Sequence, residues 1–411
     1  MARAGRGERA GRVEVADIRA GATARKDAMT FRFPVTEQPL LDAHCHGVVT
    51  DDLTDAEFEA RSSESRLPAP PAWSPLDSPV GLAIRRWCAP ILDLPEHAPI
   101  ATYLSRRRDL GSAEANRRLI RAAGVRAMLV DTGFGADLAT RHELGTLAAA
   151  PAYEVLRLET LAESVFADAL RDNAAAEFPG RFEAALDEVG PDVVAFKSIL
   201  AYRFGFDIAA QPPSSDDVVT AVGRWQQTGR ARLTDPVLLR FLIWTALSRK
   251  PLRGKRRPLQ LHTGFGDTDL DLHRANPILL TGLIRKAQRR DLAPIVLLHC
   301  NPYHREAAYL SAFYPNVHLD IGLSVGHLGP SAGTLVREAL ELAPFSKLHY
   351  SSDAYGLAEF FLIGAMGFRV GMDAVLGDWV RSGAAAEADA RTIAAQVLGG
   401  NSRSLYPIPA S

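Results

Sequence analysis

The sequence predicts a closed parallel (β/α)8 barrel, the TIM-barrel fold, with a helical insertion after the first strand. Short apolar runs alternate with amphipathic helical stretches about eight times after residue 40. Several of these runs end in a side chain that can bind metal or transfer a proton, and in a barrel such ends meet at one rim. The rival fold, a doubly wound open sheet, needs a Gly-x-Gly-x-x-Gly turn after its first strand, and the chain has none there.

Length and composition favour one large globular unit that acts on a small molecule. The chain has 411 residues, 47% of them hydrophobic, which is ample for a buried core. Lys and Arg number 47 against 48 Asp and Glu, so the net charge of -1 argues against nucleic acid or a membrane as a partner. The three cysteines are too few and too scattered for a disulfide framework, which fits a reducing, cytoplasmic setting.

Residues 1–36 are expected to form a disordered leader, and residues 37–411 the barrel domain. The leader is rich in Ala, Arg and Gly and lacks the continuous apolar core of a secretory signal. Its acids Glu8, Glu14 and Asp17 argue against an organelle transit peptide, and Met29 is a second candidate start of translation. No apolar run approaches the roughly 20 residues needed to span a bilayer, so the sequence predicts a soluble protein.

The first predicted strand runs through residues 40–47 and places His44 and His46 two residues apart. Side chains at i and i+2 of a strand share one face, so the two imidazoles can converge on a metal ion. A chance pair of surface histidines is the competing interpretation. Cys45 points to the other face and is expected to pack as a small apolar residue. The long stretch 51–110, with helical patches at 54–65 and 80–88, is expected to be an insertion that covers the mouth of the site as a lid.

The regular alternation begins after this insertion. The further predicted strands are 125–131, 153–158, 193–198, 259–263, 295–299, 317–321 and 348–352, and the predicted helices are 114–123, 161–176, 236–247, 276–290 and 332–342. The helix 236–247 has a clear start, because Asp235 is placed to cap it and Pro236 suits its first position.

Six polar side chains stand at the C-terminal ends of predicted strands. They are His44 and His46 after the first strand, Lys197 at the fourth, His262 at the fifth, His299 at the sixth and Asp353 just past the eighth. Each alone has an ordinary explanation, as a strand-end lysine reaching solvent, a core histidine or a helix cap. Together they predict one site at the rim of the barrel, with His44 and Asp353 no more than about 10 Å apart.

Seven stretches carry a resemblance to a known family. They are LDAHCH at 41–46, FKSILAYR at 196–203, HTGFGD at 262–267, the stretch 298–309, YPNVHLD at 314–320, SSD at 351–353 and NSRSLY at 401–406. In this order they resemble the amidohydrolase superfamily of metal-dependent barrels, and in particular amidohydrolase family 2. The sequence is most similar to the barrels found fused to, or encoded beside, glutamine-synthetase-like enzymes. The resemblance covers roughly residues 40–406.

The resemblance implies a divalent metal, with Zn2+ favoured over Mn2+ or Fe2+, held by His44, His46, His262 and Asp353. His299 would bind a second metal or polarise the substrate. In binuclear relatives a lysine at the position of Lys197 is carboxylated and bridges two metals, whereas in mononuclear relatives it is not a ligand. The number of metals therefore stays open. A Lys197 that points into the site would be carboxylated, neutral or paired with a substrate carboxylate, because an ammonium is repelled by a metal dication.

The same resemblance implies hydrolytic chemistry. Zinc lowers the pKa of its bound water from about 15.7 to near 7, and Asp353 would accept the proton of that water and deliver it to a departing amine. His299 and Lys197 are the other candidate catalytic residues. Arg203 could bind a substrate carboxylate, Tyr202 could form an apolar wall and Asp267 could meet an amine. A solvated loop arginine and a turn-ordering aspartate are the competing interpretations of Arg203 and Asp267.

The predicted function is hydrolysis of an amide or other C–N bond in a small carboxylate-bearing metabolite, such as a γ-glutamyl amide. One alternative is non-oxidative decarboxylation of an unsaturated or aromatic acid. A second is a non-catalytic signalling barrel, which is disfavoured because clustered histidines without metal would be poorly satisfied buried groups. A homodimer is also expected, since barrels of this type often dimerise through their outer helices.

Overall fold

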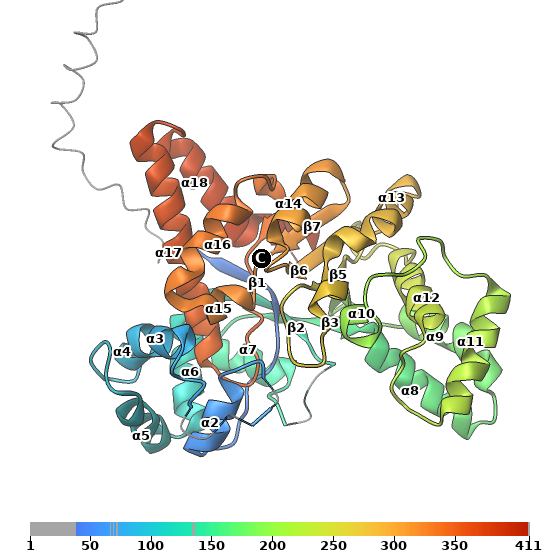
Figure 1. Cartoon of the computed structure of the whole chain (residues 1–411), viewed down its shortest axis with the longest axis horizontal. Coiled ribbons are helices and arrows are strands. Elements are labelled where there is room, and N and C mark those ends of the chain that lie inside the picture. Colours follow the sequence, from blue (N-terminus) through green and yellow to red (C-terminus); the bar gives the residue numbers. More distant parts are fainter. Residues whose placement is uncertain are drawn as a thin grey trace, which may run out of the picture.

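The computed structural model describes residues 38–409 except 66, 69, 71, 72, 134 and 136. The predicted leader, residues 1–36, lies outside the described residues. Within them, eight strands form one parallel sheet in the order β1-β2-β3-β4-β5-β6-β7-β8. Their bounds are β1 Leu40–Cys45, β2 Val125–Asp131, β3 Ala152–Arg157, β4 Val193–Ser198, β5 Leu259–Thr263, β6 Ile295–His299, β7 Val317–Asp320 and β8 Leu348–His349. The (β/α)8 barrel predicted from the sequence is confirmed (Figure 1).

The first and last strands meet at a seam that nearly closes the barrel. The backbone N–H of Ala43 donates to the carbonyl of Tyr350 at 3.0 Å, and that of Asp353 donates to the carbonyl of His44 at 2.9 Å. Strand β8 stops at His349, three residues before the predicted end, because the chain beyond it turns to bond with β1. Ser352 secures this turn, since its N–H and hydroxyl donate to the carboxylate of Asp42 at 2.8 and 2.5 Å.

Helices cover the outside of the sheet between successive strands. They include α6 Ser112–Ala122, α7 Arg141–Ala148, α8 Leu158–Arg171, α12 Pro236–Leu247, α13 Thr281–Arg289, α14 His304–Phe313, α16 Ala332–Ala339 and α17 Glu359–Ser382. The predicted start of α12 is confirmed, because the Asp235 carboxylate accepts hydrogen bonds from the N–H groups of Val237 and Leu238. The helix expected at 276–290 is shorter than predicted, since its first turn is the 3-10 segment Pro277–Leu280.

The inside of the barrel has its own small core, separate from the core between sheet and helices. Its buried members are Leu41, Ala43, Ala127, Leu129, Val155, Val194, Ala195, Val296, Leu298, Tyr406 and Ile408. Most of these are strand residues, because alternate side chains of each strand point inward. Tyr406 and Ile408 instead come from the tail after α19 Asn401–Leu405. The last described segment of the chain therefore fills part of the barrel interior.

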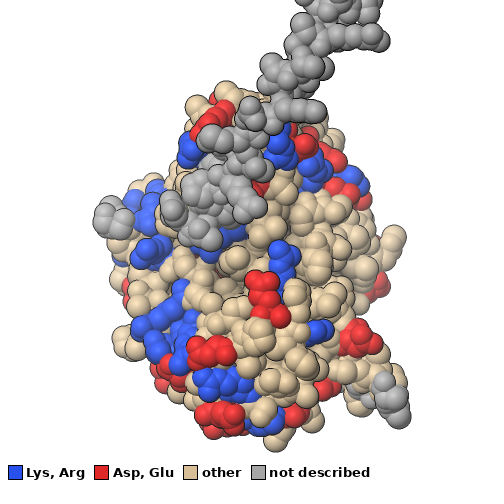
Figure 2. Space-filling view, turned by 90° about the vertical axis from the view of Figure 1, so that its left-hand side faces the viewer, with Lys and Arg blue, Asp and Glu red and all other residues tan. Residues whose placement is uncertain are grey.

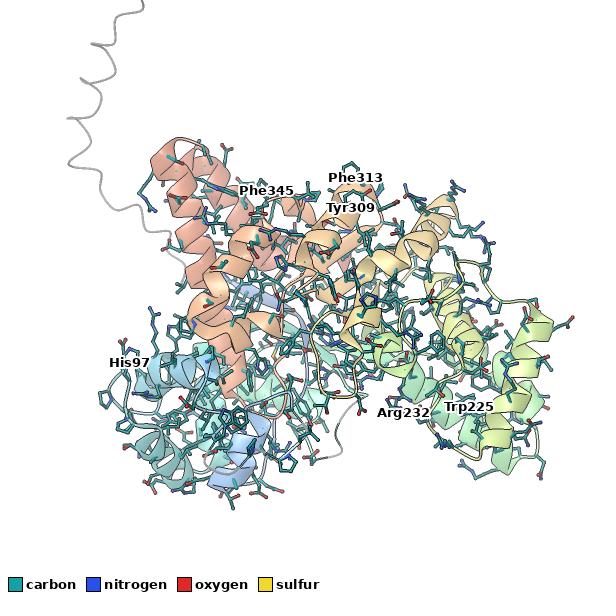
Figure 3. The ribbon with its side chains drawn as sticks, in the orientation of Figure 1. His97, Trp225, Arg232, Tyr309, Phe313 and Phe345 are labelled. Carbon is teal, nitrogen blue, oxygen red and sulfur yellow. The ribbon has the colours of Figure 1, made fainter. Side chains whose placement is uncertain are left out.

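Two groups of helices flank the barrel (Figure 1). The insertion after β1 contains α2 Asp55–Arg61, α3 Pro79–Ala83, α4 Ala89–Ile91 and α5 Ile100–Leu110. The second group, on the opposite side in Figure 1, joins α8 to α9 Phe178–Asp187, α11 Ser215–Thr228 and α12. Its core is aromatic: the ring of Trp225, labelled in Figure 3, stacks on Phe166 with centroids 3.8 Å apart. The sequence predicted the first group and did not predict the size of the second.

Helix α17 corrects one expectation from the sequence. With 24 residues and a mean hydropathy of 1.5 it is long and apolar enough to span a membrane, although no such run was expected. In the structure 78% of its apolar window is buried. Its first residue, Glu359, accepts hydrogen bonds from Tyr103 and Arg107 of the insertion, each at 2.8 Å. The length and apolarity of α17 are therefore explained by its place as a core helix that packs the insertion against the barrel.

The surface shown in Figure 2 carries both signs of charge. Basic and acidic side chains lie intermixed on this face, where grey atoms do not cover it. Many form exposed ion pairs, such as Arg337 with Asp378 at 3.1 Å. This distribution agrees with the balanced composition and the net charge of -1.

Candidate active site

The structure brings the predicted strand-end residues together at one rim of the barrel. The Nε2 atom of His44 lies 3.1 Å from Oδ1 of Asp353, and the Nε2 atom of His46 lies 3.3 Å from the same oxygen. His299 approaches the other oxygen of Asp353 at 3.6 Å. His262 lies beside His299, with ring centroids 4.5 Å apart. The expected separation of His44 and Asp353, no more than about 10 Å, is therefore met with a wide margin.

The donor set at β1 suits a cation. The Nδ1 atom of His44 lies 2.9 Å from Oε1 of Gln260, and Nδ1 of His46 lies 3.2 Å from the backbone carbonyl of Asp131. Both partners are oxygens that accept, so each neutral imidazole carries its proton on Nδ1 and directs the lone pair of Nε2 toward Asp353. Two lone pairs and a carboxylate oxygen thus meet within 4.8 Å of one another. Such acceptors repel each other unless a cation lies among them, so these residues fit a divalent metal.

Burial keeps the imidazoles of His44, His262 and His299 neutral and available as ligands. Removal from water lowers the pKa of His44 to about 4 and holds the pKa values of His262 and His299 well below the ordinary value. Burial alone raises the pKa of Asp353, and a cation among these donors would offset that effect and keep the carboxylate ionised. The cluster therefore combines neutral nitrogen donors with an ionised carboxylate, the set that binds zinc and similar metals.

His262 and His299 have buried ring nitrogens without hydrogen-bond partners. Within the described residues, Nε2 of His262 and both ring nitrogens of His299 lack such a partner. Because an unpaired buried polar group is costly, these atoms point to a ligand that binds there. His299 also has a φ of 68° and Asp353 a φ of 49°, conformations that non-glycine residues adopt rarely and mostly at functional sites.

Lys197 points into this cluster from the end of β4. Its Nζ lies 2.7 Å from Nε2 of His44 and 3.9 Å from a carboxylate oxygen of Asp131. Burial lowers the pKa of Lys197, although Asp131 opposes this. Lys197 is therefore not the solvent-reaching lysine of the competing interpretation.

Asp131 and Arg157 belong to the site and were not predicted from the sequence. Both end their strands, β2 and β3, and the guanidinium of Arg157 donates twice to one Asp131 oxygen at 3.1 and 2.7 Å. Burial opposes ionisation of Asp131, but Arg157, His46 and Lys197 hold its pKa well below the usual range. The position of each at a strand end, the same signal that identified the histidines, could have found them.

Asp320, at the end of β7, supports the histidine of β6. Its carboxylate accepts from the backbone N–H groups of His299 at 2.7 Å and Gly322 at 3.1 Å. Burial raises the pKa of Asp320 to about 7 despite these hydrogen bonds. It fixes the backbone conformation of His299. The sequence analysis missed Asp320, although its position at a strand end could have identified it, as for Asp131.

The predicted substrate-binding residues are divided between the site and its surroundings. Tyr202 lies against His262 with ring centroids 4.6 Å apart, and its hydroxyl accepts from the backbone N–H of Asp267 at 3.3 Å. The carboxylate of Asp267 accepts from the N–H of Asp269, as in an ordered turn. Arg203 instead donates to Glu163 of α8 at 2.5 Å and is largely buried. This pairing competes with the predicted role of Arg203 in carboxylate binding.

A contact between the insertion and the barrel lies at the mouth of the site. The carboxylate of Glu64 lies 3.3 Å from Nε2 of His327, on α15 Ser324–Leu328 after β7. His327 packs against Phe265 with ring centroids 5.5 Å apart, and Glu64 is close enough to Tyr202 to raise its pKa after the larger effect of burial. The insertion therefore reaches the loops that follow β5 and β7.

Comparisons with known proteins agree with this geometry. The amidohydrolase family model matches residues 252–408, which include His262, His299 and Asp353. A protein of Lactobacillus casei ATCC 334, provisionally described as a metal-dependent hydrolase, has a similar structure, with a TM-score of 0.78 and 28% identity. That match covers 90% of this chain and 96% of the other. The C-terminal part of the chain is therefore similar to the amidohydrolase family. The family and this relative assign the protein to the hydrolases.

Two further proteins are similar to this chain. Protein fluG of Emericella nidulans is 28% identical over 92% of this chain, and the chain spans about half, 47%, of the length of that relative. Uronate isomerase of Thermotoga maritima matches at a TM-score of 0.58 and 13% identity, covering 90% of this chain and 95% of the other. The isomerase shares the fold, and at this identity the likeness extends no further.

Proposed function

We propose that this protein hydrolyses an amide or other C–N bond of a small carboxylate-bearing metabolite with the help of a divalent metal. One observation carries the proposal: the Nε2 atoms of His44 and His46 lie 3.1 and 3.3 Å from Oδ1 of Asp353, while the Nδ1 atom of each ring faces an oxygen. His262 completes the proposed ligand set, and Zn2+ is the metal we favour. A bound divalent metal lowers the pKa of a water ligand and polarises a substrate carbonyl.

Asp353 is the proposed proton carrier. In the reaction, water adds to the carbonyl carbon and the C–N bond breaks, so one proton must move from the water to the leaving nitrogen. Asp353 is suited to this transfer because its second oxygen, Oδ2, lies on the side of His299 at 3.6 Å. His299 is proposed to stabilise the negative charge that develops on the carbonyl oxygen.

Lys197 is proposed to act in one of two forms. Its Nζ lies 2.7 Å from Nε2 of His44, so a carboxylated Lys197 would place an anion at the ligand cluster and support a second metal. A neutral Lys197 would donate to the cluster and leave room for one metal only. Intact-protein mass spectrometry separates these forms, because carboxylation adds the mass of carbon dioxide and Lys197→Met removes it.

The substrate class follows from the charges around the site. Asp267 and Glu64 stand near Tyr202 and favour an amine. A neutral Lys197 can donate to a carboxylate, whereas Arg157 is already paired with Asp131. An amino-acid head group carries both charges. We therefore propose γ-glutamyl amides as the first substrates to test, with Arg203 a lesser candidate for the carboxylate because it pairs with Glu163.

The insertion is proposed to act as the lid. Its contact with the barrel through Glu64 and His327 closes over the mouth of the site. His327→Ala is expected to raise KM more than it lowers kcat, because it removes a closing contact without touching the ligand set. Equal KM values for the variant and the wild type would argue against a lid.

The decisive experiment combines metal analysis with a substrate panel. Protein expressed with zinc and manganese supplied is expected to retain about one or two metal ions per chain and to release amine from γ-glutamyl amides. Intact γ-glutamyl amides together with turnover of unrelated amides would overturn the substrate class. Carbon dioxide released from an unsaturated or aromatic acid without an amine would assign the protein as a decarboxylase. Protein that retains no metal would contradict the whole proposal.

A further inference from the structure

A fully buried amide side chain lies directly behind the metal-facing ring of His44. Gln260 is the second residue of β5 and has three side-chain contacts. Its Nε2 atom donates to the backbone carbonyl of Ala43 at 2.8 Å and to the hydroxyl of Tyr406 at 2.9 Å. Its Oε1 atom lies 2.9 Å from Nδ1 of His44. Both N–H groups and the oxygen of the amide therefore have a partner.

These contacts leave one orientation for the amide. The carbonyl of Ala43 can only accept a hydrogen bond, so the atom of Gln260 that faces it at 2.8 Å must be the N–H donor. The amide oxygen then faces His44, and an amide oxygen can only accept. His44 must supply the proton, so its Nδ1 carries the hydrogen and its Nε2 keeps the lone pair.

We propose that Gln260 is a positioning residue that fixes the tautomer of His44 and so presents Nε2 as a metal ligand. The inference rests on the proposed metal-dependent function and adds to it the group that prepares a ligand. Outer partners of ligating histidines fix both ring orientation and tautomer, and their loss costs roughly 10- to 100-fold in metal affinity.

The inference also gives a role to the tail of the chain. Tyr406 is fully buried in the barrel interior, together with Leu41, Ala43 and Leu129. Its hydroxyl holds one N–H of Gln260 while Ala43 holds the other. The tail therefore reaches the metal centre through one side chain, from the opposite end of the barrel. His46 needs no such group, because the backbone carbonyl of Asp131 takes its Nδ1 proton at 3.2 Å.

A matched pair of variants at residue 260 tests the positioning role. Gln260→Met keeps the length of the side chain but offers His44 no strong acceptor, so the dissociation constant for zinc should rise about 10- to 100-fold. Gln260→Glu, buried and therefore protonated, keeps an oxygen for the Nδ1 proton and an O–H that can donate to the carbonyl of Ala43, so it should bind zinc within about threefold of the wild type. Zinc affinity is measured by competition with a chelator, independently of turnover. Equal zinc affinity of a folded Gln260→Met variant and the wild type overturns the proposal.

Two tyrosine variants separate the hydrogen bond from packing. Tyr406→Phe keeps the ring and removes one partner of Gln260, so zinc affinity should fall by less than tenfold, because Ala43 still orients the amide. Tyr350→Phe is the control: Tyr350 is equally buried, but its hydroxyl has no hydrogen-bond partner among the described residues. An equal loss of affinity in both variants would show a packing effect and refute the role of Tyr406.

The tautomer itself can be observed without metal and without variants. In metal-free wild-type protein labelled with 15N-histidine, the NMR signals of His44 should be those of the Nδ1–H tautomer. Signals of the Nε2–H tautomer overturn the inference even if every variant fails to fold. Failure of the wild type to bind zinc would instead overturn the proposed function, and the tautomer measurement would still decide the role of Gln260.

Discussion

The two pairs of histidines in the site are supported very differently. At β1, the Nδ1 atoms of His44 and His46 each face an oxygen acceptor, 2.9 and 3.2 Å away. At β5 and β6, Nε2 of His262 and both nitrogens of His299 have no hydrogen-bond partner among the described residues. The β1 pair is therefore held in its binding geometry by the protein itself. The β5–β6 pair depends on whatever binds in the site to satisfy its nitrogens.

The difference has an energetic meaning. An unpaired buried polar group costs about 1–3 kcal/mol, so the β5–β6 pair lowers the stability of the metal-free protein. A metal or substrate that bonds these nitrogens recovers that free energy as affinity. The β1 pair contributes to affinity differently. Its rings are already held in place before binding, so little conformational entropy is lost when a metal binds.

The largest expected effect comes from breaking the site where the two pairs meet. Asp353 lies within 3.6 Å of His44, His46 and His299, so Asp353→Ala removes both the shared carboxylate and the proposed proton carrier. The kcat/KM for the best substrate should fall roughly 10³-fold or more, and His44→Ala should do the same. Steady-state kinetics on folded variants checks this. Retained turnover in Asp353→Ala would refute its role in proton transfer.

A second prediction sets the two pairs against each other in the metal-free protein. His44→Leu leaves Oε1 of Gln260 and Nζ of Lys197 without their partner and should lower the free energy of unfolding by about 3 kcal/mol. His299→Leu removes two unpaired nitrogens and should leave the stability unchanged or raise it by about 1 kcal/mol. Urea denaturation after metal removal measures both. Equal destabilisation by the two substitutions would contradict the contrast.

The sequence predicted the barrel and most of the residues that cluster at its rim for one physical reason. Each of His262 and His299 ends a short apolar run, and parallel strands bring such ends to one rim. Asp131 and Arg157 end strands as well, so the same signal could have identified them. A single acid or base at a strand end is usually a solvated charge, however, and the pairing of these two becomes evident only in the structure, where β2 and β3 are neighbours.

Gln260 shows a different limit. It lies inside β5, and its role depends on its contacts with β1 across the barrel interior and on Tyr406, 146 positions away in the sequence. Arg203 shows the opposite limit. Its loop position suggested substrate binding, and only the packing of the helices beside the barrel reveals its partner Glu163. The local sequence pattern identified residues at the ends of strands. The hydrogen-bond partners of Gln260 and Arg203 are distant in the sequence and could be identified only from the tertiary structure.

A third pair of histidines sharpens the comparison through pH. Nδ1 of His318 faces Nε2 of His349 at 3.0 Å, and Nδ1 of His349 faces Ser402 at 2.8 Å, away from the site. Burial, with a smaller effect from Lys347, lowers the pKa of His318 to about 4. Between pH 4 and 6.5 the unfolded state then binds more protons than the folded state, so stability falls as pH decreases through this range.

His318→Gln removes this linkage. Between pH 6.5 and 4 the free energy of unfolding of the wild type should fall by on the order of 2 kcal/mol relative to that of the variant. Above pH 7 the difference between the two proteins should not change with pH. Urea denaturation at a series of pH values gives this difference. Both proteins should bind zinc equally, because His318 makes no contact with the ligand set. A pH-independent difference would show that His318 is not held neutral by burial.

The smallest expected effect concerns the residue between the two β1 ligands. Cys45 is fully buried on the opposite face of the strand, where its thiol lies 3.6 Å from the carbonyl of Leu129. Cys45→Ala should cost about 1 kcal/mol in the free energy of unfolding, through lost packing, and leave zinc affinity within twofold. Thermal denaturation and chelator competition measure the two quantities separately. A tenfold loss of zinc affinity would indicate that Cys45 binds the metal. Because neighbouring side chains of a strand point to opposite faces, Cys45 could do so only if β1 rearranged when metal bound.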